Sequence, residues 1–524
     1  MATITRRGFV KRSSAVGGGL AGVGALQAFG AQVAAGQTPG SHPGYGPLVA
    51  KPAQNDPSMV LMLPERFNFV VVSRQGVPMS DGNPTPGIFD GTGSYFTRDD
   101  DITILIRNHE NRRRLGEIPV IVPPDKRYDP DPSYDAGDTK LVVKRRRAGR
   151  NPDGTRRYTY EVLHDFAILG GTDTNCAGGV IGDKWYTCEE VVNRSAVSGL
   201  KHGYNYAIPA YADGPVKAVP LPNQGRFVHE AVAELDGILY QTEDRSLQAD
   251  PLVGTIGSVF YRFVPGGRDG DDDDDDRRGL RGGFEGSGKL QGLKLSDEFR
   301  ANMDTGRVVG RPYRVEWVDV DEPDHDDDTD NDRTRTPGLT PTRIQAIDKG
   351  AAFFDRQEGI WTAYQGHGKV YFDCTTGGAL NLGQVWEYDP RRRTITLVFE
   401  STNIAQLEAP DNVVIVPRTG DIFLQEDGSA QQFIRGVTQD GKIYDFAATV
   451  TNETEFCGGC FDEDGFTLFV SQQGERSGNN PPGTVPTTPG ELEGTPDARA
   501  VTYAIYGPFE DRRGRRRGGD DDDD

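Results

Sequence analysis

The chain has 524 residues, with 58 Lys and Arg against 79 Asp and Glu, so its formal charge is −21. This balance disfavours general nucleic-acid binding, because the phosphate backbone would be repelled. No run of 18 or more apolar residues occurs, which excludes a polytopic membrane protein. The 67 glycines and 34 prolines favour many turns and few long helices, and five cysteines are too few for a disulfide scaffold.

The N-terminus has the pattern of an export signal. Residues 5–11, Thr-Arg-Arg-Gly-Phe-Val-Lys, form a twin-arginine motif, and a weakly apolar run rich in Gly and Ala follows to Ala35. We expect residues 1–35 to be a twin-arginine signal peptide and residues 36–60 a flexible linker. The twin-arginine export machinery would then be a partner, and the protein would be periplasmic or extracellular without a transmembrane anchor.

Low-complexity segments interrupt the rest of the chain. The stretch 123–154, rich in Pro, Asp and Arg, and the acidic stretches 271–276 and 319–332 predict solvated loops or disorder. None has the spaced ligands and central glycine of an EF-hand loop. We therefore expect one domain over residues 61–510, with insertions near 120–158 and 266–345, followed by a disordered charged tail over residues 511–524.

A strand pattern recurs outside those insertions. Short β-type segments, each ending in a polar or acidic cluster, start at residues 103, 184, 238, 369, 421 and 466. Once the insertions are subtracted, the spacing is about 50 residues, which is typical of a four-stranded propeller blade. The sequence therefore predicts an all-β fold, a six-bladed β-propeller with long acidic loop insertions.

Potential metal ligands stand at the ends of these hairpins. In an antiparallel hairpin the first and last residues lie at the same end, so a radial arrangement would bring them to one mouth of the central channel. The side chains gathered in this way are Cys176, Glu189, Glu190, Glu230, Glu243, Glu358, Asp411, Glu426 and Glu455. Crowded carboxylates demand cations, and oxygens with one thiolate indicate hard cations, with a transition metal at the sulfur.

A series of motifs, in order along the chain, resembles the PhoX-type alkaline phosphatase family. They include 175–179 (Asn-Cys-Ala-Gly-Gly), 225–231 (Gly-Arg-Phe-Val-His-Glu-Ala) and 356–360 (Arg-Gln-Glu-Gly-Ile). The other motifs lie at residues 108–110, 186–190, 242–245, 261–265, 409–412, 426–428 and 460–465. The resemblance implies a six-bladed propeller that holds iron and calcium and releases inorganic phosphate from small-molecule phosphomonoesters outside the cytoplasm.

The same resemblance implies roles for individual residues. Cys176 would be the thiolate ligand of iron, and Glu358 and Arg356 would be catalytic, with Arg356 binding the phosphate. The carboxylates shared between iron and calcium would come from Glu189 or Glu190, Glu230 and Glu358. Candidates for calcium ligation are Asp411, Asn412, Glu426 and Asp427. The choices between Glu189 and Glu190, and between Glu426 and Asp427, stay open by one residue.

Other interpretations remain open at this point. His109 and His229 are candidates for a general acid, although histidines beside glutamates more often have a hydrogen-bonded structural role. Cys457 and Cys460 form a C-x-x-C pattern that is either a metal or redox pair or two incidental thiols. The alternative functions are a secreted calcium-binding propeller without catalysis, and another propeller hydrolase of lactonase or phytase type.

Overall fold

A computed structural model describes residues 43–112, 117–151, 154–266, 283–363, 368–429, 431–474 and 499–510. The expected signal peptide and charged tail lie outside these ranges, as does the acidic stretch 271–276. The described residues form an all-β fold with one short α-helix, α2 (Thr342–Asp348), and one 3-10 turn, η2 (Pro222–Gln224). None of the described helices is long and apolar enough to cross a membrane.

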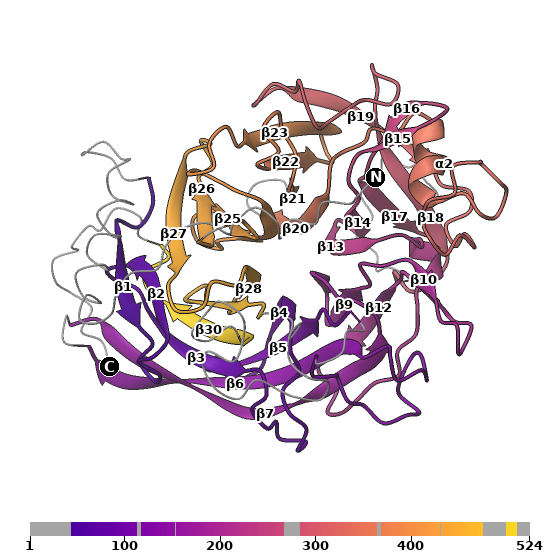
Figure 1. The fold of residues 1–524 in the computed structure, drawn as a ribbon. Helices are drawn as coiled ribbons and strands as arrows, with labels where there is room; N and C mark the ends of the chain where they lie inside the picture. The colour runs from indigo at the N-terminus through magenta and orange to yellow at the C-terminus, as the bar shows by residue number, and fades with distance from the viewer. Residues whose placement is uncertain are drawn as a thin grey trace, which may run out of the picture. The chain divides into compact units, whose positions relative to one another are not determined.

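Inner strands lie in a ring, and further strands pair outward from each of them. The ring strands are β4 (Phe89–Phe96), β8 (Gly179–Ile181), β13 (His229–Leu235), β20 (Gln357–Ala363), β24 (Pro410–Ile415) and β28 (Phe456–Phe461). Each contacts the next in this order, and β28 contacts β4, so the ring closes. Figure 1 shows β4, β13, β20 and β28 around a common axis.

The outer strands follow their ring strand in chain order, and each pairs antiparallel with the strand before it. After β4 come β5 (Ile102–His109), β6 (Ala136–Arg150) and β7 (Arg156–Thr172), and after β8 come β9 (Lys184–Cys188) and β12 (Asn205–Pro209). After β13 come β14 (Ile238–Glu243), β17 (Tyr261–Pro265), β18 (Gly288–Leu295) and β19 (Pro312–Asp319). After β20 come β21 (Lys369–Cys374), β22 (Gln384–Asp389) and β23 (Thr394–Glu400).

The last two sheets are completed by the N-terminal part of the chain. After β24 come β25 (Ile422–Glu426), β26 (Phe433–Val437) and β27 (Ile443–Thr449), and after β28 come β29 (Thr467–Gln472) and β30 (Val501–Tyr506). β2 (Val60–Pro64) joins β27 and carries β1 (Leu48–Pro52), and β3 (Asn68–Arg74) pairs with β30. The range 36–60, expected to be a linker, therefore contains a strand and the buried side chains of Leu48 and Met59.

The sheets differ from the expected set of separate four-stranded units. The outer strands β19 and β23 pair with each other and join two sheets into one of nine strands, while the β8 sheet has three. Two short hairpins lie apart, β10 (Asn193–Arg194) with β11 (Lys201–His202) and β15 (Gln248–Asp250) with β16 (Gly254–Ile256). The all-β class is confirmed, whereas the hydrogen-bonded sheets do not divide into six equal blades.

The described parts of the two expected insertions contain regular strands. β6 lies within 120–158, and β7 begins in that range and continues to Thr172. β18 and β19 lie within 266–345. The last five residues of β6, 146–150, are exposed, and charged residues there replace the usual apolar alternation. Arg145, the partly buried residue directly before them, forms ion pairs with Asp462 and Asp464, both at 2.9 Å. Charged composition therefore hid strands that polar contacts hold in place.

Close approach of the ring strands leaves no room for side chains at certain positions. A Cβ atom on Gly179 would collide with the carbonyl oxygen of Val232, and one on Gly91 would collide with that of Ala177. A Cβ atom on Gly359 would lie 2.6 Å from the backbone nitrogen of Val413. Glycine at these positions therefore lets neighbouring sheets converge on the axis.

Replacing Gly179 with Ala should lower the free energy of unfolding by about 1–3 kcal/mol, because the added methyl group overpacks the contact between β8 and β13. Chemical denaturation measures this change. Gly214→Ala is the matched control, since a Cβ atom there meets nothing within 4 Å. Equal stability of the two variants would contradict the tight approach of the ring strands.

Candidate metal centre

One recurring register brings polar side chains to the same end of the ring. The residue pairs that close the hairpins at this end are Phe89–His109, Asn175–Glu189, His229–Glu243, Gln357–Cys374, Pro410–Glu426 and Phe456–Gln472. The residues directly after the first five first-strand partners are Asp90, Cys176, Glu230, Glu358 and Asp411. Those directly after four of the second-strand partners are Glu110, Glu190, Asp244 and Asp427.

The backbone turns these side chains out of the regular strand pattern. Asp90, Glu230, Glu358 and Asp411 each lie at a shift in strand register, the mark of a β-bulge, which bends a strand and redirects a side chain. A residue with positive φ stands two positions before four of the ligand candidates. These residues are Ile88, Thr174, Arg356 and Ala409, with φ between 47° and 52°.

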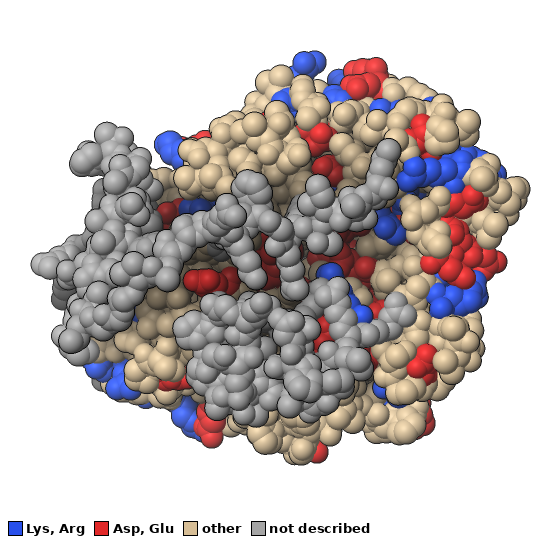
Figure 2. Space-filling view, in the orientation of Figure 1, with Lys and Arg blue, Asp and Glu red and all other residues tan. Residues whose placement is uncertain are grey.

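Three groups of candidate ligands result, each with ligand atoms within 4.8 Å of one another. The groups are Glu110, Cys176 and Glu190; Glu230, Glu358 and Asp411; and Asp411, Asp427 and Glu455. Asp411 belongs to two groups, and the Sγ of Cys176 lies 3.5 Å from Oδ2 of Asp90. Figure 2 shows Asp and Glu gathered in a hollow at the centre of the displayed face, with Lys and Arg beside them.

Some of these buried carboxylates lack hydrogen-bond donors. Among the residues that the structure describes, no donor lies in hydrogen-bonding geometry to either buried carboxylate oxygen of Glu230. Burial raises the pKa of Glu230 well above its usual range, and the nearby Glu190, Asp411 and Asp90 raise it further. Burial likewise raises the pKa of Asp90 to about 6 and that of Glu190 to about 7. Cations at this end of the ring would remove these penalties, so the donor set fits bound metal ions.

Glu189 and Glu243, which directly precede Glu190 and Asp244, have other partners. Glu189 accepts hydrogen bonds from the backbone N–H groups of Gly203 (2.8 Å) and Asp173 (3.1 Å) and contacts the ring of His202 (2.7 Å). Glu243 accepts from the N–H of Val259 at 2.9 Å. Their carboxylates are thus used within the protein fold, and neither belongs to the three groups.

The choice between Glu426 and Asp427 follows the same pattern, in which the earlier acid bonds within the fold and the later one belongs to a candidate group. Glu426 accepts hydrogen bonds from Nε of Arg435 (2.9 Å) and from the N–H of Glu408 (3.0 Å), whereas Asp427 belongs to a candidate group. Asn412 donates from Nδ2 to Asp411 at 2.6 Å and accepts from the N–H of Gly458 at 2.9 Å. Asn412 therefore contacts a candidate ligand directly.

Two arginines lie against the groups. Arg356 donates to both carboxylate oxygens of Asp244, at 2.8 and 3.0 Å, and to Glu358 at 2.7 Å, while its side chain is 25% exposed. Arg112 pairs with Glu110 and with Glu190, the latter at 3.1 Å. Arg356 was predicted from the family motif, whereas nothing in the motif reasoning selected Arg112.

Sequence reasoning also left out Asp90, Glu110 and Asp244 as site residues, and it named Glu455 among the potential ligands at the channel mouth without assigning it to a metal. The pair register provides a signal for the first three, because each directly follows a residue that closes a hairpin. Glu110 and Asp244 were moreover inside the quoted motifs 108–110 and 242–245. Glu455 precedes Phe456 instead of following it, so the same rule does not find it.

The remaining candidates have structural contacts. His109 is buried and contacts the carbonyl oxygen of Gly87 and the hydroxyl of Thr139, both at 2.8 Å. His229 contacts the carbonyl oxygen of Gly225 at 3.0 Å, and burial lowers its pKa to about 3. Cys457 and Cys460 are buried free thiols, without a disulfide between them.

Comparison with known proteins identifies the family. The family model described as alkaline phosphatase PhoX matches residues 44–475. The chain belongs to the PhoX alkaline phosphatase family. This PhoX protein is therefore a metal-dependent alkaline phosphatase that acts on small-molecule phosphate esters. No curated protein matches the chain.

Solved structures support the fold of this PhoX protein. It is similar to Pseudomonas fluorescens PhoX in complex with vanadate, a transition state analogue, with 17% identity and a TM-score of 0.57 over 87% of this chain and 97% of that chain. A putative 6-phosphogluconolactonase from Bacteroides uniformis gives 11% identity and a TM-score of 0.33 over 79% and 83% of the two chains. The second likeness is too weak to carry an argument.

Glu190→Gln should lower the metal content of the purified protein, because Glu190 lies in a ligand group, and with chelator present it should unfold no earlier than wild type, because it removes a buried charge. Glu189→Gln should instead lower the melting temperature, since it disturbs a buried carboxylate bonded to backbone N–H groups, a loss of about 1–3 kcal/mol. Elemental analysis and thermal unfolding on both variants test this distinction. Metal loss in Glu189→Gln with retention in Glu190→Gln would reverse the assignment.

Removing metal with a chelator should make stability depend on pH. The folded pKa values of Asp90 and Glu190 are raised to about 6 and about 7, so the metal-free fold is favoured below their unfolded values and loses stability as pH rises toward 7. Each unit of raised pKa corresponds to about 1.4 kcal/mol.

Thermal unfolding of chelator-treated protein between pH 4 and pH 8 measures this loss, and calcium-supplemented protein is the control. Added cations should reduce the decline. A metal-free protein that gains stability toward pH 8 would contradict the charge crowding described above.

Proposed function

We propose that the protein is a phosphoric monoester hydrolase that uses iron and calcium to release inorganic phosphate from small-molecule phosphomonoesters. The observation that carries the proposal is the placing of three adjacent ligand groups beside the half-buried guanidinium of Arg356. A phosphomonoester carries two negative charges at neutral to alkaline pH, and its hydrolysis requires those charges to be neutralised.

The donor atoms support a division of the metals between the groups. The group of Glu110, Cys176 and Glu190 contains the sulfur, which favours a transition metal, so we assign iron to it. The group of Glu230, Glu358 and Asp411 and the group of Asp411, Asp427 and Glu455 offer only oxygen, which is the preference of calcium. Bound metals would supply positive charge against the phosphoryl oxygens and lower the pKa of a water nucleophile.

Within this proposal, the protein residues bind and orient the ester. Asp244 holds the guanidinium of Arg356 through two hydrogen bonds, so its direction is fixed before substrate arrives. Glu358 accepts a further bond from Nη2 of Arg356 and belongs to a ligand group, which ties the cation to the metal site. Arg356 would donate to the phosphoryl oxygens, and Glu358 would set its distance from the metals.

We also propose that the six ring strands each mark one blade of a propeller, and that residues 1–35 direct export by the twin-arginine machinery to the periplasm or beyond. The motif at residues 5–11 supports export. The family assignment disfavours the lactonase and phytase alternatives. A calcium-binding propeller without catalysis would need neither the thiol of Cys176 nor Arg356.

Cys176→Ser should remove iron from the protein and lower turnover of p-nitrophenyl phosphate by about 10³-fold or more, because a hydroxyl is a poor substitute for a thiolate ligand. Elemental analysis and a phosphatase assay measure the two effects. Cys460→Ser is the control, since Cys460 is fully buried in a hydrophobic cluster outside the groups, and it should retain iron. Full turnover in Cys176→Ser would refute the iron assignment, and a wild-type protein with calcium alone would refute the need for iron.

A further inference from the structure

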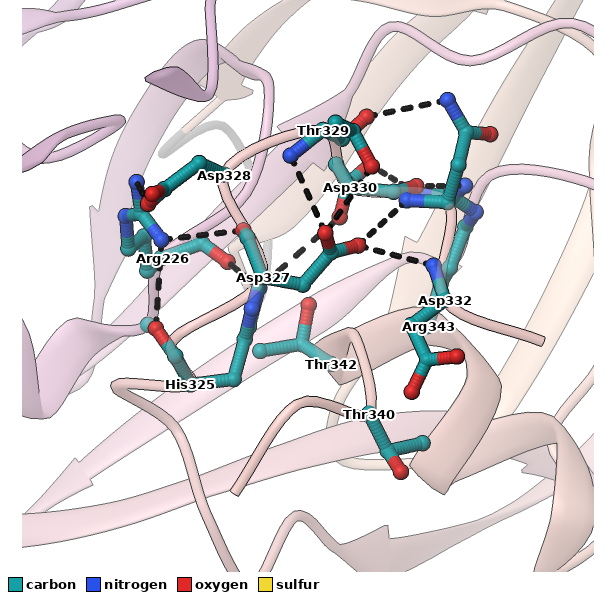
Figure 3. Close-up of polar contacts among 12 residues, drawn as sticks. Arg226, His325, Asp327, Asp328, Thr329, Asp330, Asp332, Thr340, Thr342 and Arg343 are labelled. Carbon is teal, nitrogen blue, oxygen red and sulfur yellow. Dashed lines mark hydrogen bonds and ion pairs between the residues drawn. The ribbon is translucent and has the colours of Figure 1, made fainter. Parts of the chain in front are cut away.

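The acidic segment, residues 319–332, is ordered in the structure although its composition predicts a solvated loop. Asp327 accepts hydrogen bonds from the backbone N–H groups of Thr329 (3.1 Å), Asn331 (2.6 Å) and Asp332 (2.7 Å), as Figure 3 shows in part. These bonds fold the segment back on itself, and Asp330 at their centre has positive φ. The segment is therefore a built element with a defined backbone.

The exposed acids of this segment are already paired. Arg194 binds Asp328 at 2.8 Å and Asp326 at 3.2 Å, and Arg226 binds Asp328 at 3.0 Å. Arg194 of β10 and Arg226, between η2 and β13, thus neutralise these outer carboxylates and hold the segment in place. The segment does not present an open cage of oxygens to a cation.

Asp330 is fully buried and reaches inward between two arginines. Its Oδ2 accepts a hydrogen bond from Nε of Arg245 at 2.9 Å and another from Nη1 of Arg343 of α2. Arg343 also lies 3.7 Å from Glu243, so its charge is shared between two buried carboxylates. Figure 3 shows Asp330 and Arg343 on the inner side of the segment. Asp330 therefore anchors the acidic segment to Arg245, which directly follows Asp244 in the chain.

Arg245 lies between this anchor and the site. It directly follows Asp244, the carboxylate that holds Arg356, and its carbonyl oxygen accepts a hydrogen bond from the N–H of Arg356 at 3.1 Å. Burial lowers the pKa of Arg245, while the carboxylates of Glu243, Asp244 and Glu190 act in the opposite direction. Arg245 is thus linked to Arg356 by a backbone hydrogen bond and follows its partner Asp244 in the chain.

The terminal nitrogens of Arg245 are left available. Asp330 uses only Nε, and among the residues that the structure describes, Nη1 and Nη2 of Arg245 donate no hydrogen bond. The side chain is 23% exposed, so a small solute can reach it. A guanidinium fixed at Nε by a carboxylate presents its other edge in a set direction, which suits an oxyanion.

We propose that Arg245 is a second substrate-contacting cation that donates from Nη1 and Nη2 to the phosphoryl oxygens alongside Arg356, with Asp330 of the acidic segment as its positioning residue. The proposal rests on the phosphatase function proposed above. It gives the acidic segment a role in substrate binding, because the segment supplies the carboxylate that directs Arg245.

The test uses the full, metal-loaded protein with Arg245→Gln and Arg245→Lys. We expect KM for p-nitrophenyl phosphate and the dissociation constant of inorganic phosphate, measured by calorimetry, to rise about 10- to 100-fold in Arg245→Gln, the range for hydrogen bonds to charged groups. Metal content should stay at the wild-type level. Arg245→Lys keeps a positive charge beside Asp330 but loses the guanidinium fork, so it should give a smaller rise with a wild-type melting temperature.

Positioning by Asp330 has its own readout. Asp330→Asn should raise KM and the phosphate dissociation constant in the same direction as Arg245→Gln, and Asp330→Asn combined with Arg245→Gln should add little more. Arg194→Gln is the control, because Arg194 binds the same acidic segment on its outer side, and it should leave both constants unchanged. Free guanidinium at millimolar concentration should partly restore phosphate affinity to Arg245→Ala.

Several outcomes would overturn the inference. Unchanged phosphate affinity in both Arg245 variants would show that Arg245 only holds the acidic segment. A raised KM with unchanged phosphate affinity would place the contact on the leaving group, contrary to the proposal. If wild-type protein binds phosphate but hydrolyses no monoester, the proposed function fails, while the affinity of Arg245→Gln for phosphate still decides the role of Arg245. A wild-type protein that binds no phosphate would overturn both.

Discussion

Repulsion among buried carboxylates governs this structure. Glu230, Glu358 and Asp411 come from three different ring strands, yet their oxygens lie within 4.8 Å of one another at one end of the ring. Burial and mutual repulsion raise the pKa of each of these three groups. Such an arrangement persists in a folded protein only when cations bind or protons are taken up. The buried carboxylates therefore depend on the cations that balance their charge.

Bringing these carboxylates together requires strained backbone conformations. Ile88, Thr174, Arg356 and Ala409 have positive φ, a conformation that costs a residue other than glycine about 1–3 kcal/mol. β-Bulges follow in β4, β13, β20 and β24. Glycines let neighbouring ring strands approach each other closely. The outer strands pack into large hydrophobic clusters, and this packing holds the inner strands in their strained backbone conformation.

The sequence predicts the all-β class and the meeting of distant acids, because the two ends of a hairpin are neighbours whatever the rest of the fold does. It does not decide between Glu189 and Glu190, since that choice depends on a strand register that only the pairing of Asn175 with Glu189 fixes. Asp90 was missed for the same reason. The strands inside the expected insertions were missed because ion pairs, such as Arg145 with Asp462, replace apolar alternation there.

Pairing of β3 with β30 joins an early strand of the described chain to the last one. Gln473, just beyond β29, donates to Asp90 at 3.2 Å and to Glu110 at 2.9 Å, so the first and last sheets meet at the metal centre itself. During synthesis, these partners exist together only after β29 has left the ribosome. A nascent or truncated chain that ends before residue 473 lacks the amide that bridges Asp90 and Glu110, so the complete constellation forms only after the final sheet has been translated.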